Sequence, residues 1–268
     1  MSEISHIVKS YEEELQNLND NLIKMGSLVE TQLSDSMEAI IKVDKDAAEN
    51  IIKNDAKINE LRATIEEQIV NVLVKRAPMA IDLRLTISTL KISSDLERIG
   101  DLAKSVAKKI KPLPHDLPEE LIASLRRLGD LVQRQLKDIL DAYLKKSKEL
   151  AIKIWKTDEK VDDLTHTAMN EVADFLGKDK KNLDLATHLL FVTKNIERAG
   201  DHITNIAESL FYLIEGEHIE GARPKGKDFD SNFMSANIYI IEDEEPIITL
   251  IKYNLEKEGY KVSYSDNG

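Results

Sequence analysis

Residues 96–101 read LERIGD, and residues 196–201 read IERAGD, the same pattern displaced by 100 residues. A second match precedes the first, because DAKINEL at residues 55–61 returns as DEKVDDL at residues 158–164, displaced by 103. The two displacements differ by three residues, and these extra residues fall in the predicted turn between the matched segments, where insertions are well tolerated. Two matches in the same order indicate an internal duplication and a pseudo-symmetric molecule.

Apolar residues recur at spacings of three and four around these segments, which predicts long amphipathic helices. The expected helices cover about residues 7–42, 46–76, 79–110, 118–149, 151–177 and 183–215. Short connections favour antiparallel neighbours. The sequence therefore predicts an all-α fold of two pseudo-symmetric antiparallel three-helix bundles, residues 1–113 and 114–216, separated by the proline-rich stretch KPLPHDLP at 111–118.

Composition restricts the class of protein. The 268 residues carry 37 Lys and Arg against 49 Asp and Glu, a net charge of −12, which argues against nucleic acid as the main partner. The chain contains no Cys and no run of 18 uncharged apolar residues, so we expect neither a disulfide framework nor a membrane span. A cytoplasmic protein fits these features, and contact with a membrane is expected only through partners.

Acidic residues occupy one face in each repeat. Glu97 and Asp101 are four residues apart on one helix, nearly opposite its apolar stripe, and are therefore expected to point out of the bundle. A hairpin folded at Pro78, or at the turn near residue 179, brings the acidic pairs of its two helices to the same height. Such oxygen clusters suit hard or borderline divalent cations. The candidate metal ligands are Asp55, Asn59, Glu97, Asp101, Asp158, Asp162, Glu197 and Asp201.

Two glycines recur beside these carboxylates. Gly100 and Gly200 lie in the middle of predicted helices, where Gly costs roughly 1 kcal/mol relative to Ala. The repeated cost indicates that some group approaches the helix backbone closely at both places. The alternative for the acidic face itself is a solvated surface with weak ion pairs to Arg98 and Arg198.

Both repeats resemble the PhoU family of phosphate-uptake regulators, whose pattern is a duplicated three-helix bundle with E(D)xxxD pairs on facing helices. The resemblance covers about residues 5–216 and includes the stretch APMAIDLR at 77–84. It departs from the pattern at Asn59, where an amide replaces a carboxylate. It implies a negative regulator of the phosphate-starvation response, which links the ATPase subunit of a phosphate ABC transporter to a sensor histidine kinase. The resemblance also implies a bound metal (iron, zinc, magnesium or manganese). Separately, the exposed helical faces favour a homodimer.

The last residues have a different character. Residues 217–236 are predicted to form a linker, and 237–268 a short incomplete β-α-β segment with strands at Ile238–Ile241 and Tyr260–Tyr264. This segment resembles the start of a response-regulator receiver domain, in which Glu242 and Asp243 match the acidic pair that helps to bind magnesium. The sequence stops before the strand that would carry the phosphoacceptor Asp, so no active receiver is expected.

Acidic helical bundles also occur in other classes of protein. A di-metal carboxylate enzyme needs inward-facing Glu-x-x-His motifs, and the sequence offers only Glu215 with His218, at a helix end and unrepeated. We therefore predict that the chain is not an enzyme and has no catalytic residues. The remaining alternative is a metal-binding helical scaffold or storage protein without a signalling role, or a purely structural scaffold whose acidic face is solvated.

Overall fold

The structure is a computed structural model that describes residues 2–224, 237–241 and 261–265. The chain divides into two compact units, residues 1–226 and 227–268.

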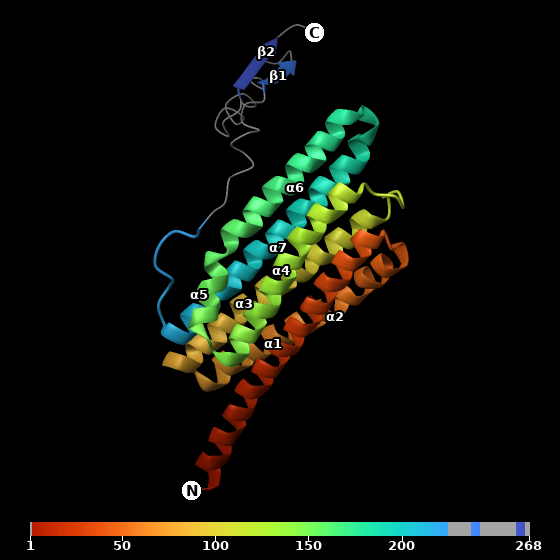
Figure 1. The fold of residues 1–268 in the computed structure, drawn as a ribbon. Helices are drawn as coiled ribbons and strands as arrows, with labels where there is room; N and C mark the ends of the chain where they lie inside the picture. The colour runs from red at the N-terminus through yellow and green to blue at the C-terminus, as the bar shows by residue number, and fades with distance from the viewer. Residues whose placement is uncertain (1, 225–236, 242–260, 266–268) are drawn as a thin grey trace. The chain divides into compact units, whose positions relative to one another are not determined.

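All regular secondary structure in the described residues of the first unit is helical (Figure 1). Its α-helices are α1 (Ser2–Lys42), α2 (Lys45–Arg76), α3 (Ala80–Ile110), α4 (Glu119–Lys145), α5 (Lys148–Lys156), α6 (Asp158–Lys178) and α7 (Leu183–Glu215), and a 3₁₀ turn, η1 (Lys180–Asn182), precedes α7. The predicted all-α fold is confirmed. Helices α1 to α3 form the first repeat, and α4 to α7 form the second.

One predicted helix is broken. The expected helix over residues 151–177 consists of α5 and α6, which meet at Thr157. The Thr157 backbone N–H bonds the carbonyl of Ile154, three residues back, and the Thr157 hydroxyl donates to the same oxygen at 2.8 Å. A Thr hydroxyl that bonds nearby backbone competes with the helical pattern, so the regular helix stops here.

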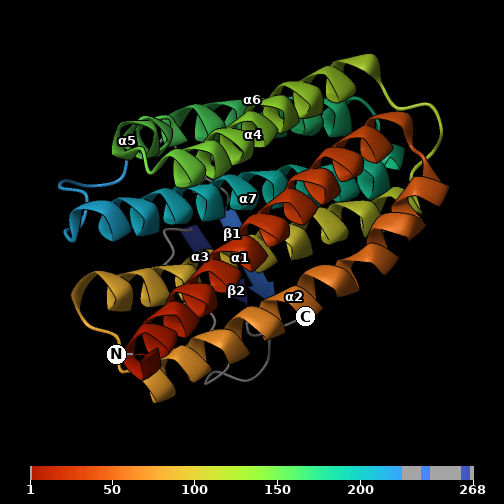
Figure 2. The same ribbon diagram turned by 90° about the horizontal axis from the view of Figure 1, so that it is seen from below.

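The two repeats meet along α3 and α7, which pack against each other more extensively than any other described pair of helices. His202 of α7 lies across this contact with its Nδ1 2.9 Å from Oδ1 of Asp95. Two further hydrogen bonds across it come from asparagines: Asn195 donates to the Ser105 hydroxyl at 3.1 Å, and Asn205 donates to the Asp95 carboxylate at 3.3 Å. Adding 100 to Asp95 and Ser105 gives the positions of Asn195 and Asn205, so the repeat relation exchanges the two bonds. The duplication is therefore also a pseudo-twofold relation in space (Figure 2).

The first helices of the two repeats, α1 and α4, also touch, and small residues let them approach. A Cβ atom at Gly26 would lie 2.6 Å from Cδ2 of Leu140, and one at Gly129 would collide with the end of the Met37 side chain. Because neither helix has a side chain at these points, Leu140 and Met37 can fill the crossing.

The second unit contains two short strands. Strand β1 (Asn237–Ile241) pairs in parallel with β2 (Lys261–Ser265), with Asn237 opposite Lys261 and Ile241 opposite Ser265. Both strands lie where the sequence predicts them. The helix predicted between them, together with Glu242 and Asp243, falls outside the described residues. Among the described residues, no helix is both long and apolar enough to cross a membrane.

Candidate functional site

The first acidic cluster joins α2 to α3 through a lysine. Lys104 Nζ lies 2.5 Å from Oδ2 of Asp55 and 3.0 Å from Oδ1 of Asp101. The side chain of Asp55 is only 4% exposed, whereas that of Asp101 is 36% exposed. The hydrogen bond from Lys104 to Asp55 raises the pKa of the ammonium, against the opposing effect of burial and with a further contribution from Asp101. The buried carboxylate is thus neutralised by a cation from its own repeat.

Two amides complete the surroundings of Asp55. Gln32 of α1 donates from Nε2 to Oδ1 of Asp55 at 2.9 Å and to the carbonyl of Gly100 at 3.0 Å. Asn59 donates from Nδ2 to Oδ2 of Asp55 at 3.3 Å. All three helices of the first repeat therefore meet at this carboxylate. Asn59 acts as a hydrogen-bond donor in this arrangement.

The second cluster repeats this geometry with a different cation. The guanidinium of Arg223 donates to both carboxylate oxygens of Asp158, at 2.6 and 2.8 Å, and to Oδ1 of Asp201 at 2.7 Å. Thr204, at the position that corresponds to Lys104, donates from its hydroxyl to Oδ1 of Asp158 at 3.0 Å. Arg223 follows α7, outside the duplicated segments, and it bridges α6 to α7 as Lys104 bridges α2 to α3.

Burial lowers the pKa of the Arg223 guanidinium, but the hydrogen bond to Asp158 and the charges of Asp158, Asp201 and Glu208 outweigh it and raise the pKa overall. Besides Asp158 and Asp201, a third carboxylate, that of Glu197, lies close to the cluster. Burial raises the pKa of Glu197, and the charges of Asp201 and Asp162 raise it further, although Lys194 pairs with it at 2.9 Å. The second repeat therefore gathers more negative charge than Arg223 alone balances.

The structure confirms one part of the sequence prediction and corrects another. Acidic residues on facing helices do lie at the same height, because in each repeat one cation contacts a carboxylate from each of the two helices. The expectation that the acidic residues look out of the bundle is wrong for Asp55 and Asp158, which are both 3% exposed. Glu97, Asp101, Asp162, Glu197 and Asp201 are half-buried, and Asn59 is exposed.

The glycines have a packing role. A Cβ atom on Gly100 would lie 3.1 Å from Cδ1 of Ile58, and one on Gly200 would lie 3.1 Å from Cγ1 of Val161. Ile58 and Val161 occupy corresponding positions of the two repeats. The close approach predicted from the sequence is therefore real, but the approaching group is an apolar side chain of the neighbouring helix.

The carboxylates fit a metal ion by their chemistry but not by their placement. Among the residues that the structure describes, no three His, Cys, Asp or Glu side chains are positioned to hold a metal ion together. The position between the facing carboxylates is taken by Lys104 in the first repeat and by Arg223 in the second. Metal binding by the eight predicted ligands stays a prediction, and it requires that these cations move away.

The sequence reasoning missed Lys104, Gln32 and Arg223. Lys104 could have been found, because it lies three residues after Asp101 and so on the same helical face. Arg223 could not be found in this way, because it lies outside the duplicated helices and has no helical spacing to the acidic residues. The Glu215 and His218 pair has other partners: Glu215 pairs with Lys148 at 2.8 Å, and the His218 ring stacks on Tyr212.

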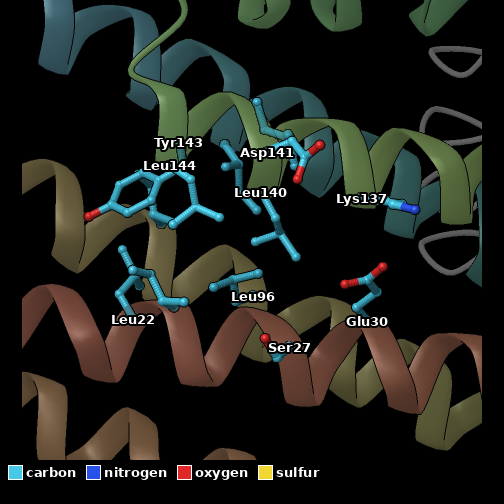
Figure 3. A pocket seen from close by; sticks show the side chains of 13 residues that line it. Leu22, Ser27, Glu30, Leu96, Lys137, Leu140, Asp141, Tyr143 and Leu144 are labelled. Carbon is cyan, nitrogen blue, oxygen red and sulfur yellow. The ribbon is translucent and has the colours of Figure 1, made fainter.

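A separate pocket opens between α1 and α4 (Figure 3). It has a volume of about 130 Å³ and an apolar lining that includes Leu22, Leu96 and Leu140, with Glu30 and Lys137 at its edge. Burial raises the pKa of Tyr143 in its wall to about 12. The Tyr143 hydroxyl donates to Oδ1 of Asn19 at 2.8 Å, so it ties α4 to α1. This pocket belongs to the contact between the repeats.

Comparison with known proteins identifies the duplicated bundle. The family model described as the PhoU domain matches residues 22–110 and again 125–210, once on each repeat. The chain belongs to the PhoU domain family. Each of its two PhoU repeats contains one of the acidic clusters described above.

Relatives agree with this assignment over most of their length. The phosphate-specific transport system accessory protein PhoU homolog of Caulobacter vibrioides is 40% identical over 82% of this chain and 96% of the relative. The phosphate-specific transport system accessory protein PhoU of Serratia marcescens is 34% identical over 80% and 88%. The crystal structure of PhoU from Pseudomonas aeruginosa matches with a TM-score of 0.75 and 34% identity, over 77% of this chain and 100% of that one.

Proposed function

We propose that this protein is an accessory protein of a phosphate transport system and a negative regulator of the phosphate-starvation response. It would act by binding, without catalysis, as an adaptor between the ATPase subunit of the transporter and a sensor histidine kinase. The observation that carries the proposal is the match of both repeats to the PhoU domain, together with 96% coverage of a relative named as a transport accessory protein. Such partners would place the protein at the cytoplasmic side of the membrane.

An adaptor needs exposed surfaces that partners can bury, and the α2–α3 end of the first repeat has one. The side chains of Val74, Met79 and Ile81 are 79%, 82% and 66% exposed, with Val70 and Leu83 nearby in the sequence. The turn between the helices holds Ala77 and Ala80 at φ of 43° and 49°, a backbone conformation that costs energy for any residue except glycine. Clustered exposed apolar residues favour a protein interface. A homodimer is a second proposed use of such surfaces.

Metal binding is a separate part of the proposal. Facing carboxylates would supply oxygen ligands for iron, zinc, magnesium or manganese, once Lys104 or Arg223 had moved. Metal analysis of the purified protein, with Asp101→Ala and Asp201→Ala beside it, tests this. A bound metal in the wild type that is reduced in either variant supports the proposal. No metal in any of the three proteins overturns it and leaves the adaptor role intact.

The regulatory role is tested by alkaline phosphatase activity in phosphate-replete cells, with and without this gene. We expect high activity in the deletion strain and repression when the full-length gene is returned. Unchanged activity in the deletion would contradict the regulatory role and favour the scaffold or storage alternative.

The adaptor surface has its own test in the same cells. Met79→Ser with Ile81→Ser should lose repression, because both side chains are exposed and their replacement removes only the surface that a partner would bury. Leu183→Ser is the matched control, since Leu183 is 55% exposed at the start of α7 in the other repeat. Equal repression by both variants would remove the α2–α3 end from the proposal.

A further inference from the structure

The second cluster depends on a segment that lies outside the helices. Beyond α7, Gly216 turns the chain at φ of 82°, and Gly221 turns it again at φ of 99°. Within residues 217–224, no backbone hydrogen bond joins the segment to another described residue. Side chains therefore hold it in place: His218 stacks on Tyr212, Ile219 packs against the core, and Arg223 enters the acidic cluster.

The two clusters differ in how firmly their cations are held. Lys104 belongs to α3, the same helix as Asp101, so it stays within reach as long as α3 is folded. Arg223 is 22 residues beyond Asp201, on a segment without backbone ties. It can therefore leave its cluster without the unfolding of any helix.

We infer that residues 216–223 form a latch, in which Arg223 supplies a cation to the second acidic cluster from the same chain and whose release makes that cluster more anionic. When the latch is closed, the guanidinium of Arg223 makes the paired contacts with a carboxylate for which arginine is suited. Its partner is Asp158, whose side chain is only 4% exposed. When the latch is open, Asp158 and Asp201 lose this partner. In the first repeat the corresponding cation, Lys104, is part of α3, so it can leave only by rotation of its side chain and not with a backbone segment.

The latch also lies on the path to the second unit. The chain continues from Arg223 through Pro224 to that unit, which begins at Lys227. In chain order, Arg223 therefore lies between α7 and the second unit. Release of the latch would change the charge of the second cluster, an effect that the accessory role proposed above does not require.

Chemical modification of arginine tests the latch in the full-length protein. Phenylglyoxal reacts with free guanidinium groups, and mass spectrometry gives the rate at each arginine. In the wild type, Arg223 should react roughly tenfold more slowly than the exposed Arg126, because its donors are engaged by two carboxylates. Equal rates at the two arginines in the wild type would overturn the inference.

A pair of variants separates the latch from general burial. In Asp158→Asn with Asp201→Asn, Arg223 loses both anionic partners and should react at a rate close to that of Arg126. Asp163→Asn is the matched control, since Asp163 is exposed on the same helix and should leave Arg223 protected. Far-UV circular dichroism verifies that each variant keeps its helices. A folded double variant in which Arg223 stays as slow as in the wild type would also overturn the inference.

Discussion

The two acidic clusters are built alike from duplicated helices, yet they are neutralised differently. In the first repeat Lys104 extends from α3 to Asp55 and Asp101, while in the second Arg223 arrives from beyond α7 and takes the corresponding place against Asp158 and Asp201. The duplication preserved the buried carboxylate but not the source of its counter-charge. A buried carboxylate needs a partner, and the chain can supply that partner from any segment that reaches it.

The largest effect should follow from removing the fixed cation. Lys104→Gln leaves Asp55 buried with only neutral donors, and should lower the free energy of unfolding by about 3 kcal/mol. Urea denaturation measures the change. Adding Asp55→Asn should restore most of the loss, because the buried charge is then gone. No recovery in the double variant would show that Lys104 stabilises the repeat by some other contact.

The next largest effect should follow from removing Arg223, and a lysine at position 204 tests whether a cation on α7 can replace it. Arg223→Gln should cost about 2 kcal/mol, because Thr204 still donates to Asp158. Thr204→Lys in the same chain places an ammonium where Lys104 lies in the first repeat, and should recover roughly half of that loss. The urea midpoints of the single and double variants give the answer. A Thr204→Lys change that lowers stability further would mean that the clusters are not interchangeable.

The glycines test whether the repeats pack equally. Gly100→Val and Gly200→Val both push a branched side chain against the neighbouring helix, and each should cost roughly 1.5 kcal/mol. Ile58→Ala should relieve the first substitution, and Val161→Ala the second. Thermal unfolding of the four proteins tests this. A loss of stability in only one of the two glycine variants would show that the repeats do not pack equally at these positions.

The smallest effect is expected where the repeats touch. Asn195→Ala and Asn205→Ala each remove one hydrogen bond between α3 and α7, worth about 1 kcal/mol. Because the two bonds are related by the duplication, their losses should be similar and should add in the double variant. Urea denaturation of the single and double variants gives these values. Strong non-additivity would indicate that the contact shifts as a unit.

The sequence was sufficient for most of the helices and for the matched heights of the acidic residues on facing helices. The predicted helices over 79–110 and 183–215 are α3 and α7 almost to the residue, because their apolar spacing is regular and their ends lie beside turns. The break at Thr157 was missed, since a Thr in a regular pattern does not reveal that its hydroxyl will bond Ile154.

The cations could not be read from the repeats themselves. When the two repeats are aligned, Thr204 in the second occupies the position of Lys104 in the first, so the second repeat has lost a positive charge there. Arg223 compensates for that loss from a glycine-containing segment whose path depends on tertiary contacts of His218, Ile219 and the buried Asp158. Such a segment has no helical periodicity from which its path could be predicted, so the sequence indicates only a linker.

The most direct test of the account is the coupling energy between Arg223 and Asp158. A double-mutant cycle with Arg223→Gln, Asp158→Asn and both together, measured by urea denaturation of the full-length protein, isolates this pair. A bidentate bond to a buried carboxylate predicts a coupling of about 2 kcal/mol, with the double variant more stable than Arg223→Gln alone. A coupling below about 0.5 kcal/mol would contradict the claim that Arg223 is the counter-charge of the second repeat.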